Sequence, residues 1–147
     1  MNFEEVEIKI TLSGVWWRDP PRCEIYLDQM VIDRLYVSAN RLNSEKRDIL
    51  FKGNLTEGQH WLTVRFLNKK DDDDQFDENG VSTLLQHLHI ENITINKINF
   101  DISKGSKCCK LKKDKVVRPY PSGLLTENCD WSLRFSVPTY VWLMENS

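Results

Sequence analysis

Two alternating runs flank an acidic segment in the middle of this chain: WLTVRFL over residues 61–67, NKKDDDDQFDENG over residues 68–80 and LHIENITI over residues 88–95. Alternation of apolar and polar residues in the first and third runs is typical of β-strands with one buried face and one solvated face. The six carboxylates between them are tolerated only at the rim of a sheet, where water or a cation screens their charge. The pattern therefore favours a binding or assembly module over an enzyme.

The same alternation recurs towards both ends of the chain. Residues 6–12 and residues 131–137 alternate without a break, and Pro138 ends the second of these runs because proline cannot donate to a strand ladder. A change of apolar phase near Glu91 predicts a β-bulge, and Asn96-Lys97 predicts a tight hairpin turn. Residues 139–144 form an apolar tail, and no run of ten residues has a helical period.

Together these signals predict an all-β fold, an antiparallel β-sandwich that is jelly-roll-like, with long irregular loops. The lysine-rich stretch from Ser103 to about Asp130 is expected to be irregular, because prolines interrupt it around Tyr120. A length of 147 residues is enough for one ordinary core, so we expect a single domain over residues 1–147.

Composition limits the kinds of partner. A net charge of −2 argues against nucleic acid, which needs a concentrated basic face, and no apolar run is long enough to span a membrane. The N-terminus does not look like a secretory signal, so we expect synthesis in a cytoplasm with all four cysteines reduced. Nucleophile elbows, phosphate-binding loops and metal-binding cysteine spacings are all lacking in the sequence, which predicts that the protein is not an enzyme.

The acidic segment has three interpretations. Asp72, Asp74 and Asp77, with loop carbonyls, could supply oxygen ligands to calcium, although the spacing of an EF-hand is missing. The segment could instead be a solvated charge run, which is the commoner role of such runs. A third interpretation pairs it with the basic stretch 104–115 of another copy in an ordered assembly.

Aromatic residues outside the alternating runs are the candidate binding contacts. Trp16 and Trp17 lie in a proline-flanked loop, where they could stack on sugar rings, anchor a partner or plug the end of the sandwich. Tyr140 and Trp142 lie in the apolar tail and are expected to contact a partner as well.

Residues 58–100 resemble calcium-dependent carbohydrate-binding modules of the xylan-binding type. The resemblance rests on the Trp61 strand, the acidic loop after an asparagine, and the pattern Ile90-x-x-Ile93-x-Ile95-Asn96-x-Ile98. It implies a β-sandwich with calcium and sugar sites in the acidic loop. The Asp-Arg-Asn-Leu motif of those modules is replaced here by residues 80–85, GVSTLL.

A second resemblance, to small virion-type proteins of tailed marine bacteriophages, covers most of the chain. It rests on Gly53-x-Leu55-x-x-Gly58-x-His60-x-Leu62 and on the closing pattern Trp-x-Leu-x-Phe-x-x-Pro-x-Tyr-x-Trp-Leu over residues 131–143. It implies a non-enzymatic phage structural protein, a capsid decoration or a tail- or baseplate-associated component. Such a protein would be made in the host cytoplasm and located in the virion, in many copies, bound to other virion proteins or to itself. The alternative is a carbohydrate-binding module that grips glycans with or without calcium.

Overall fold

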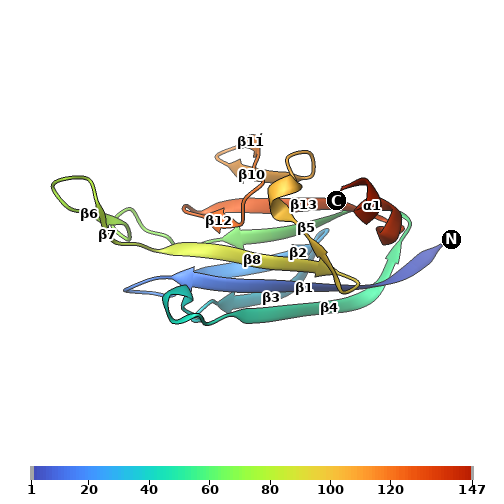
Figure 1. The fold of residues 1–147 in the computed structure, drawn as a ribbon, viewed down its shortest axis with the longest axis horizontal. Helices are drawn as coiled ribbons and strands as arrows, with labels where there is room; N and C mark the ends of the chain where they lie inside the picture. Colours follow the sequence, from blue (N-terminus) through green and yellow to red (C-terminus); the bar gives the residue numbers. More distant parts are fainter. Residues whose placement is uncertain (1, 147) are drawn as a thin grey trace.

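The strands of residues 2–146, which the computed structural model describes, form two antiparallel sheets packed face to face (Figure 1). The five-stranded sheet has the order β12 (Leu124–Leu125), β8 (His87–Ile95), β1 (Phe3–Val15) and β4 (Arg47–Thr56), with β9 (Ile98–Phe100) paired to β8. The six-stranded sheet has the order β11 (Val116–Pro119), β10 (Cys109–Lys113), β13 (Cys129–Val137), β5 (Gly58–Phe66), β2 (Arg22–Leu27) and β3 (Met30–Tyr36). The predicted antiparallel β-sandwich is confirmed; Met1 and Ser147 of the predicted domain lie outside the described residues.

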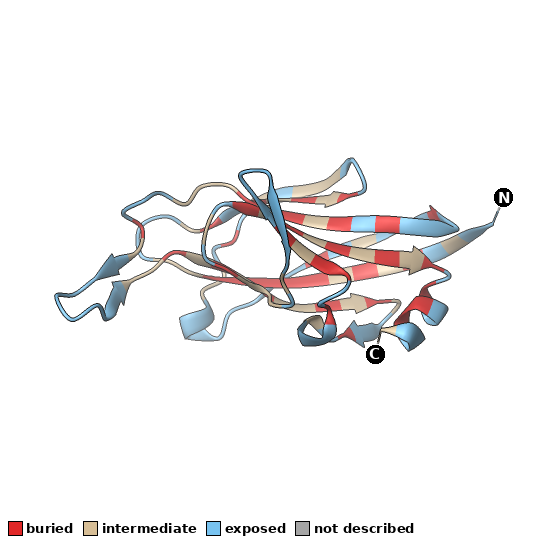
Figure 2. Cartoon of the chain, turned by 90° about the horizontal axis from the view of Figure 1, so that it is seen from above, coloured by how far each residue is buried: buried red, intermediate tan, exposed pale blue. Residues whose placement is uncertain are grey.

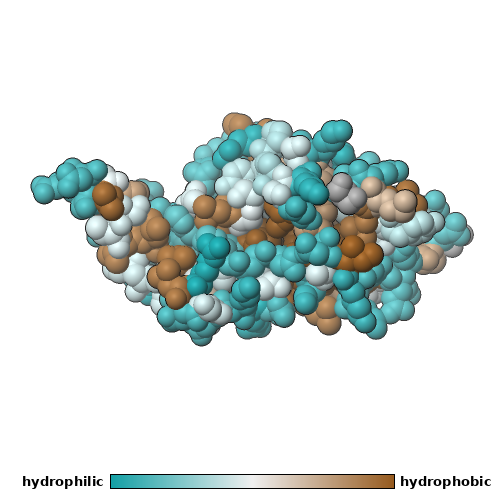
Figure 3. Space-filling view, viewed as in Figure 1, coloured by the Kyte–Doolittle hydropathy of each residue, from teal (hydrophilic) through white to brown (hydrophobic). Residues whose placement is uncertain are grey.

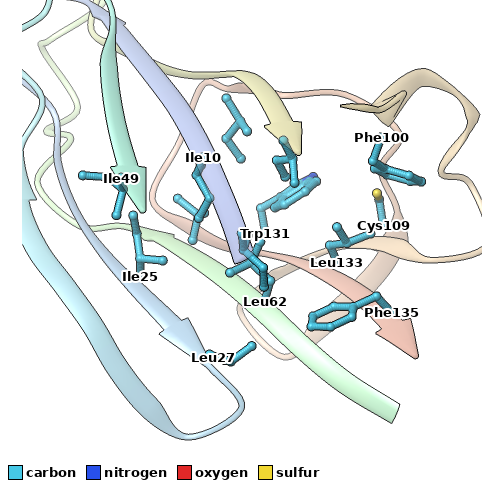
Figure 4. Close-up of a cluster of buried hydrophobic side chains, with 14 of the residues drawn as sticks. Ile10, Ile25, Leu27, Ile49, Leu62, Phe100, Cys109, Trp131, Leu133 and Phe135 are labelled. Carbon is cyan, nitrogen blue, oxygen red and sulfur yellow. The ribbon is translucent and has the colours of Figure 1, made fainter. Parts of the chain in front are cut away.

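A single core lies between the two sheets, because every second residue of the long strands points inward. Along β13 the buried and partly exposed positions alternate from Cys129 to Val137, and this striping is visible along several strands in Figure 2. Figure 4 shows Ile10, Ile25, Leu62 and Trp131 from both sheets meeting in this core. Burial of one such side chain contributes about 1.5–3 kcal/mol to folding, so the alternation fixes which face of each strand is covered.

Two of the predicted local features are confirmed. Asn96 and Lys97 both have positive φ, 50° and 68°, and they join β8 to β9 in a two-residue hairpin. The register between β1 and β8 shifts so that Thr11 pairs with Asn92 and Leu12 with Ile90, which leaves Glu91 as the extra residue of a β-bulge.

The prediction of an irregular stretch over residues 103–130 is wrong for three segments. Strands β10, β11 and β12 lie within it, and Asp114 and Lys115, both with positive φ, form the turn of the β10–β11 hairpin. Sequence alternation missed β11 because it is an edge strand whose four residues are all exposed, so no apolar phase marks it.

The apolar tail forms the short helix α1 (Thr139–Glu145), which packs on β13. The sequence predicts Trp142 as a binding contact, and the structure corrects this. The residue is only 6% exposed, and the centre of its ring lies 5.2 Å from that of Phe100 and 6.3 Å from that of Phe135. Trp142 is therefore a core residue that closes one end of the sandwich. Two 3-10 turns, η1 (Arg41–Asn43) and η2 (Ile102–Lys104), and a separate two-stranded hairpin of β6 (Gln75–Phe76) and β7 (Ser82–Leu84) complete the described secondary structure. Among the described residues, no helix is long and apolar enough to cross a membrane.

Candidate functional site

The acidic segment and the tryptophan loop meet at the end of the sandwich from which a small hairpin of β6 (Gln75–Phe76) and β7 (Ser82–Leu84) projects (Figure 1). Arg18 donates two hydrogen bonds to the Asp72 carboxylate, at 2.7 and 3.2 Å, and a third to the carboxylate of Asp73. Asp73 is only 2% exposed, and its backbone carbonyl accepts a hydrogen bond from the Trp17 indole at 2.8 Å. The bonds from Arg18 hold the pKa of Asp72 below its usual value.

A second internal cation, the ammonium of Lys69, lies deeper in the same region. Its Nζ is 2.6 Å from the carboxylate of Asp74 and also donates to the backbone carbonyl of Thr126. Asp74 accepts further bonds from the amide of Gln86, at 3.0 Å, and lies 3.5 Å from Nε2 of His87. Burial raises the pKa of Asp74, but the bonds from Lys69 and Gln86 lower it by more, so the net shift is downward.

Asp77 has a different role from Asp72 and Asp74. Its carboxylate accepts the amides of Asn79 and Val81, both at 2.9 Å, which closes the turn of the β6–β7 hairpin. The tip of this hairpin is hydrophilic, as the projecting arm in Figure 3 shows. The three predicted calcium ligands are thus not brought together, and residues 2–146 contain no group of three carboxylate, histidine or cysteine side chains arranged to hold a metal ion.

The lysine-rich stretch approaches the acidic segment within one chain. A hollow of about 420 Å³ is lined on one side by residues 69–71 and 74 and on the other by Lys113, Asp114 and residues 126–128. Lys113 is paired with Glu127 at 2.5 Å rather than with an aspartate of the acidic segment. The predicted pairing between two copies stays a prediction.

The structure distinguishes the remaining aromatic candidates. Trp16 is half-buried, and its indole nitrogen is buried without a hydrogen-bond partner, whereas Trp17 is exposed and has the guanidinium of Arg18 stacked 4.8 Å from its ring centre. Tyr140 is 63% exposed on α1. Trp17 and Tyr140 are therefore exposed to a ligand in the isolated chain, whereas Trp16 is partly covered by the protein.

A further surface, which the sequence analysis did not identify, lies on the solvent side of the six-stranded sheet. This surface, the outer face, carries the side chains that alternate with core residues on β2, β3, β5, β10 and β13. Pairing of the strands places Tyr26 beside Thr63 and Thr63 beside Ser132 in one row, with Arg65 next to Asp130 in the row below. Trp61, 40% exposed, pairs across the strands with Arg134.

Hydrogen bonds hold much of the outer face in place. Arg65 forms a bidentate pair with Asp130, at 2.7 and 3.1 Å, and its guanidinium lies 5.0 Å from the centre of the Tyr26 ring. Glu24 accepts bonds from the Tyr26 hydroxyl at 2.7 Å and from Arg34 at 2.9 Å. These bonds lower the pKa of Glu24, the bond from Tyr26 contributing most, and keep it ionised.

The sequence contained a signal for this surface. In WLTVRFL the buried phase is Leu62, Val64 and Phe66, so Trp61 falls in the polar phase with Thr63 and Arg65. A large aromatic residue in the solvent phase of a strand is a candidate contact for a ligand, because exposed tryptophan is concentrated at binding surfaces.

A polar hollow of about 350 Å³ lies beside the bulge on the other sheet. It is lined by Glu91, Asn92, Asn99, Asp101, Ser103 and Ser122, among others. Its aromatic neighbour Phe100 is only 3% exposed, so the hollow presents no ring on which a sugar could stack. The outer face, by contrast, combines an exposed indole with oriented polar groups.

The protein is therefore a β-sandwich whose outer face presents an exposed tryptophan beside oriented polar side chains. Sequence comparison finds no matching family model and no similar curated protein. The fold is similar to that of the selenomethionine form of vCBM60, reported in work on two families of calcium-dependent carbohydrate-binding modules linked by circular permutation. The TM-score is 0.55 at 12% identity, covering 87% of this chain and 89% of that one. A structure of vCBM60 in complex with galactobiose gives 0.48 at 12% identity over 88% of this chain and 97% of that chain.

The similarity establishes a fold of the kind found in carbohydrate-binding modules, which agrees with the first of the two sequence resemblances. The structural neighbour is described as a carbohydrate-binding module. Nothing in the comparisons supports the resemblance to phage virion proteins, so the virion role and location stay predictions.

The residues of this chain do not fit a calcium ion in the acidic segment. The carboxylate of Asp74 and the carbonyl of Thr126 are already bonded to the Lys69 ammonium, and the carboxylates of Asp72 and Asp73 to Arg18. A divalent cation would have to displace these internal cations or sit beside them, at a cost in charge repulsion.

Proposed function

We propose that this protein is a non-catalytic carbohydrate-binding module and that its glycan binds on the outer face. The observation that carries the proposal is Trp61, a tryptophan that is 40% exposed on an interior strand of an open sheet, with polar side chains around it. The apolar face of a sugar ring packs on an aromatic face, as other amphipathic ligands do, and the ring hydroxyls then need donors and acceptors at its edge.

The neighbours of Trp61 provide those groups. Arg134 lies opposite it on β13, and Thr63 and Ser132 follow in the next row, with their hydroxyl oxygens 3.1 Å apart. Bidentate pairing with Asp130 fixes Arg65, so part of the surface is ordered before any ligand arrives. Similarity of the fold to a carbohydrate-binding module supports the same assignment.

Binding of glycans to the purified protein, measured on an array and by calorimetry, tests the proposal. We expect Trp61→Ala to lower affinity by about 2 kcal/mol, roughly thirtyfold, with an unchanged melting temperature, because the ring is a solvent-facing contact. Tyr140→Ala, on α1, is the matched control and should leave affinity unchanged. A loss of binding with Tyr140→Ala or Trp17→Ala but not with Trp61→Ala would place the site elsewhere, and an array with no signal would reject the proposal.

A further inference from the structure

The outer face has a charge opposite to that of the whole protein. Its side chains include six cations (Arg22, Arg34, Arg65, Lys110, Lys112 and Arg134) and two anions (Glu24 and Asp130). The chain as a whole has a net charge of −2. The positive charge is therefore concentrated on this sheet face.

Internal pairing neutralises only part of the positive charge. Arg65 is paired with Asp130, and Arg34 with Glu24 at 2.9 Å. No hydrogen bond or ion pair joins the side chain of Lys110, Lys112 or Arg134 to another group among residues 2–146. Arg22 forms no ion pair among these residues either, but its guanidinium lies 5.9 Å from the centre of the Tyr36 ring. Lys110, Lys112 and Arg134 are therefore the three cations of this face that have neither an ion pair nor an aromatic partner among the described residues.

These three cations lie in three successive rows of the outer face, starting from the row of Trp61. Lys110 pairs with Ser132 and Lys112 with Asp130 across neighbouring strands, and Arg134 is two residues beyond Ser132 on the same face. Adjacent strands lie about 4.8 Å apart and successive residues on one face about 7 Å apart, so one short oligosaccharide on Trp61 could reach more than one of them. Arginine binds carboxylates and sulfates in a fork geometry that a neutral hydroxyl does not exploit.

We infer that the outer face selects an anionic saccharide, one that carries uronate carboxylates or sulfate esters, through Arg134, Lys110 and Lys112. This inference rests on the proposed function and names the ligand class of that site. Single-stranded nucleic acid is the other anionic polymer that stacks on aromatic rings. The saccharide is favoured because the hydroxyl side chains of Thr63 and Ser132 lie in the row between that of Trp61 and that of Lys112, and because the fold is similar to that of a carbohydrate-binding module.

The test compares three probes on the full chain: an oligogalacturonate, a neutral xylo-oligosaccharide and a twelve-nucleotide single-stranded DNA. We expect the uronate to bind at least tenfold more tightly than the neutral sugar in 50 mM NaCl, with the preference shrinking in 500 mM NaCl, because salt screens exposed charges. In the triple variant Arg134→Gln, Lys110→Gln, Lys112→Gln the preference should fall below twofold. The double variant Lys110→Gln, Lys112→Gln, which keeps Arg134 opposite Trp61, should weaken the preference and leave affinity for the neutral sugar within twofold. Lys9→Gln, the same change on the other sheet, should alter neither.

The outcomes separate the inference from the proposed function. Equal affinity for neutral and acidic sugars, both lost with Trp61→Ala, would overturn the inference and leave the proposed function intact. Failure of every glycan to bind would overturn both. Tighter binding of DNA than of the uronate, lost in the triple variant, would overturn the inference in favour of nucleic acid. Thermal melts of each variant establish that a loss of binding is not a loss of fold.

Discussion

The acidic end of the sandwich and the outer face are both rich in charged side chains, yet they use charge in opposite ways. At the acidic end the carboxylates of Asp72, Asp73 and Asp74 bond to Arg18 and Lys69 of the same chain. On the outer face Arg34 and Arg65 pair with Glu24 and Asp130, whereas Lys110, Lys112 and Arg134 have no ion-pair or aromatic partner among the described residues. The first arrangement joins loops to one another, whereas the second leaves charge available to another molecule.

The difference shows that density of charge is a poor guide to a binding site. Four consecutive aspartates are the most conspicuous motif in the sequence, but Asp73 is buried beneath Arg18 and Asp74 is held by Lys69. A charged group contributes to binding when folding has not already given it a partner, because displacing an internal partner costs the energy of that pair. By this criterion the outer face, not the acidic segment, is the surface on which to look for a ligand.

The largest effect we expect at the acidic end is on stability. Lys69→Met should lower the free energy of unfolding by about 2 kcal/mol, because it leaves the Asp74 carboxylate and the Thr126 carbonyl without their shared donor. The side chains of Lys69 and Asp74 are 11% and 21% exposed, so water replaces little of what is lost. Chemical denaturation measures the change.

Lys70→Met is the matched control for this prediction. Its side chain is 65% exposed and its nearest carboxylate, on Asp19, is 3.9 Å away, so stability should change by less than about 0.5 kcal/mol. Glycan affinity should be the same in both variants. Equal stabilities of the two variants would contradict a stabilising role for the Lys69–Asp74 pair. A loss of glycan binding in Lys69→Met alone would contradict the assignment of binding to the outer face.

An intermediate effect is expected from acid. The pKa of Asp74 is lower in the folded protein than in the unfolded chain, so its stabilisation is present above about pH 4 and is lost as pH falls through the folded-state pKa. The gap in melting temperature between wild type and Lys69→Met should therefore narrow by about 3 °C or more between pH 5 and pH 2.5. Thermal melts over this range measure it, and a gap that stayed constant would mean that the pair does not depend on the Asp74 charge.

The smallest expected effect is that of calcium. An ion that binds only the folded state stabilises it by about 2.7 kcal/mol at a hundred times its dissociation constant. Because Lys69 and Arg18 already bond to the carboxylates, adding calcium or a chelator should shift the wild-type melting temperature by less than 1 °C. Such a shift corresponds to a change in stability of at most about 0.3 kcal/mol. A rise of several degrees with calcium, abolished by Asp74→Ala, would show that the acidic segment is a metal site after all.

Much of the fold could be predicted from local pattern. Alternation located β1, β5, β8 and β13, and the Asn96-Lys97 turn and the Glu91 bulge followed from residue type and phase. Strand β11 and helix α1 escaped prediction, because an exposed edge strand has no apolar phase and a seven-residue helix is too short to establish a period. The burial of Trp142 depends on where that helix docks, which its own sequence does not state.

For the candidate surfaces, too, one part follows from local sequence and another only from the tertiary structure. The phase of Trp61, Arg65 and Arg134 along their strands is a local property, and the sequence by itself determined that these side chains face solvent. Which of these charges find partners was decided by the tertiary structure, because Arg18 is 54 residues from Asp72 and Arg65 is 65 residues from Asp130. Alternation depends on neighbours in the chain, whereas ion pairing depends on distances in space that the packing of two sheets and their loops creates.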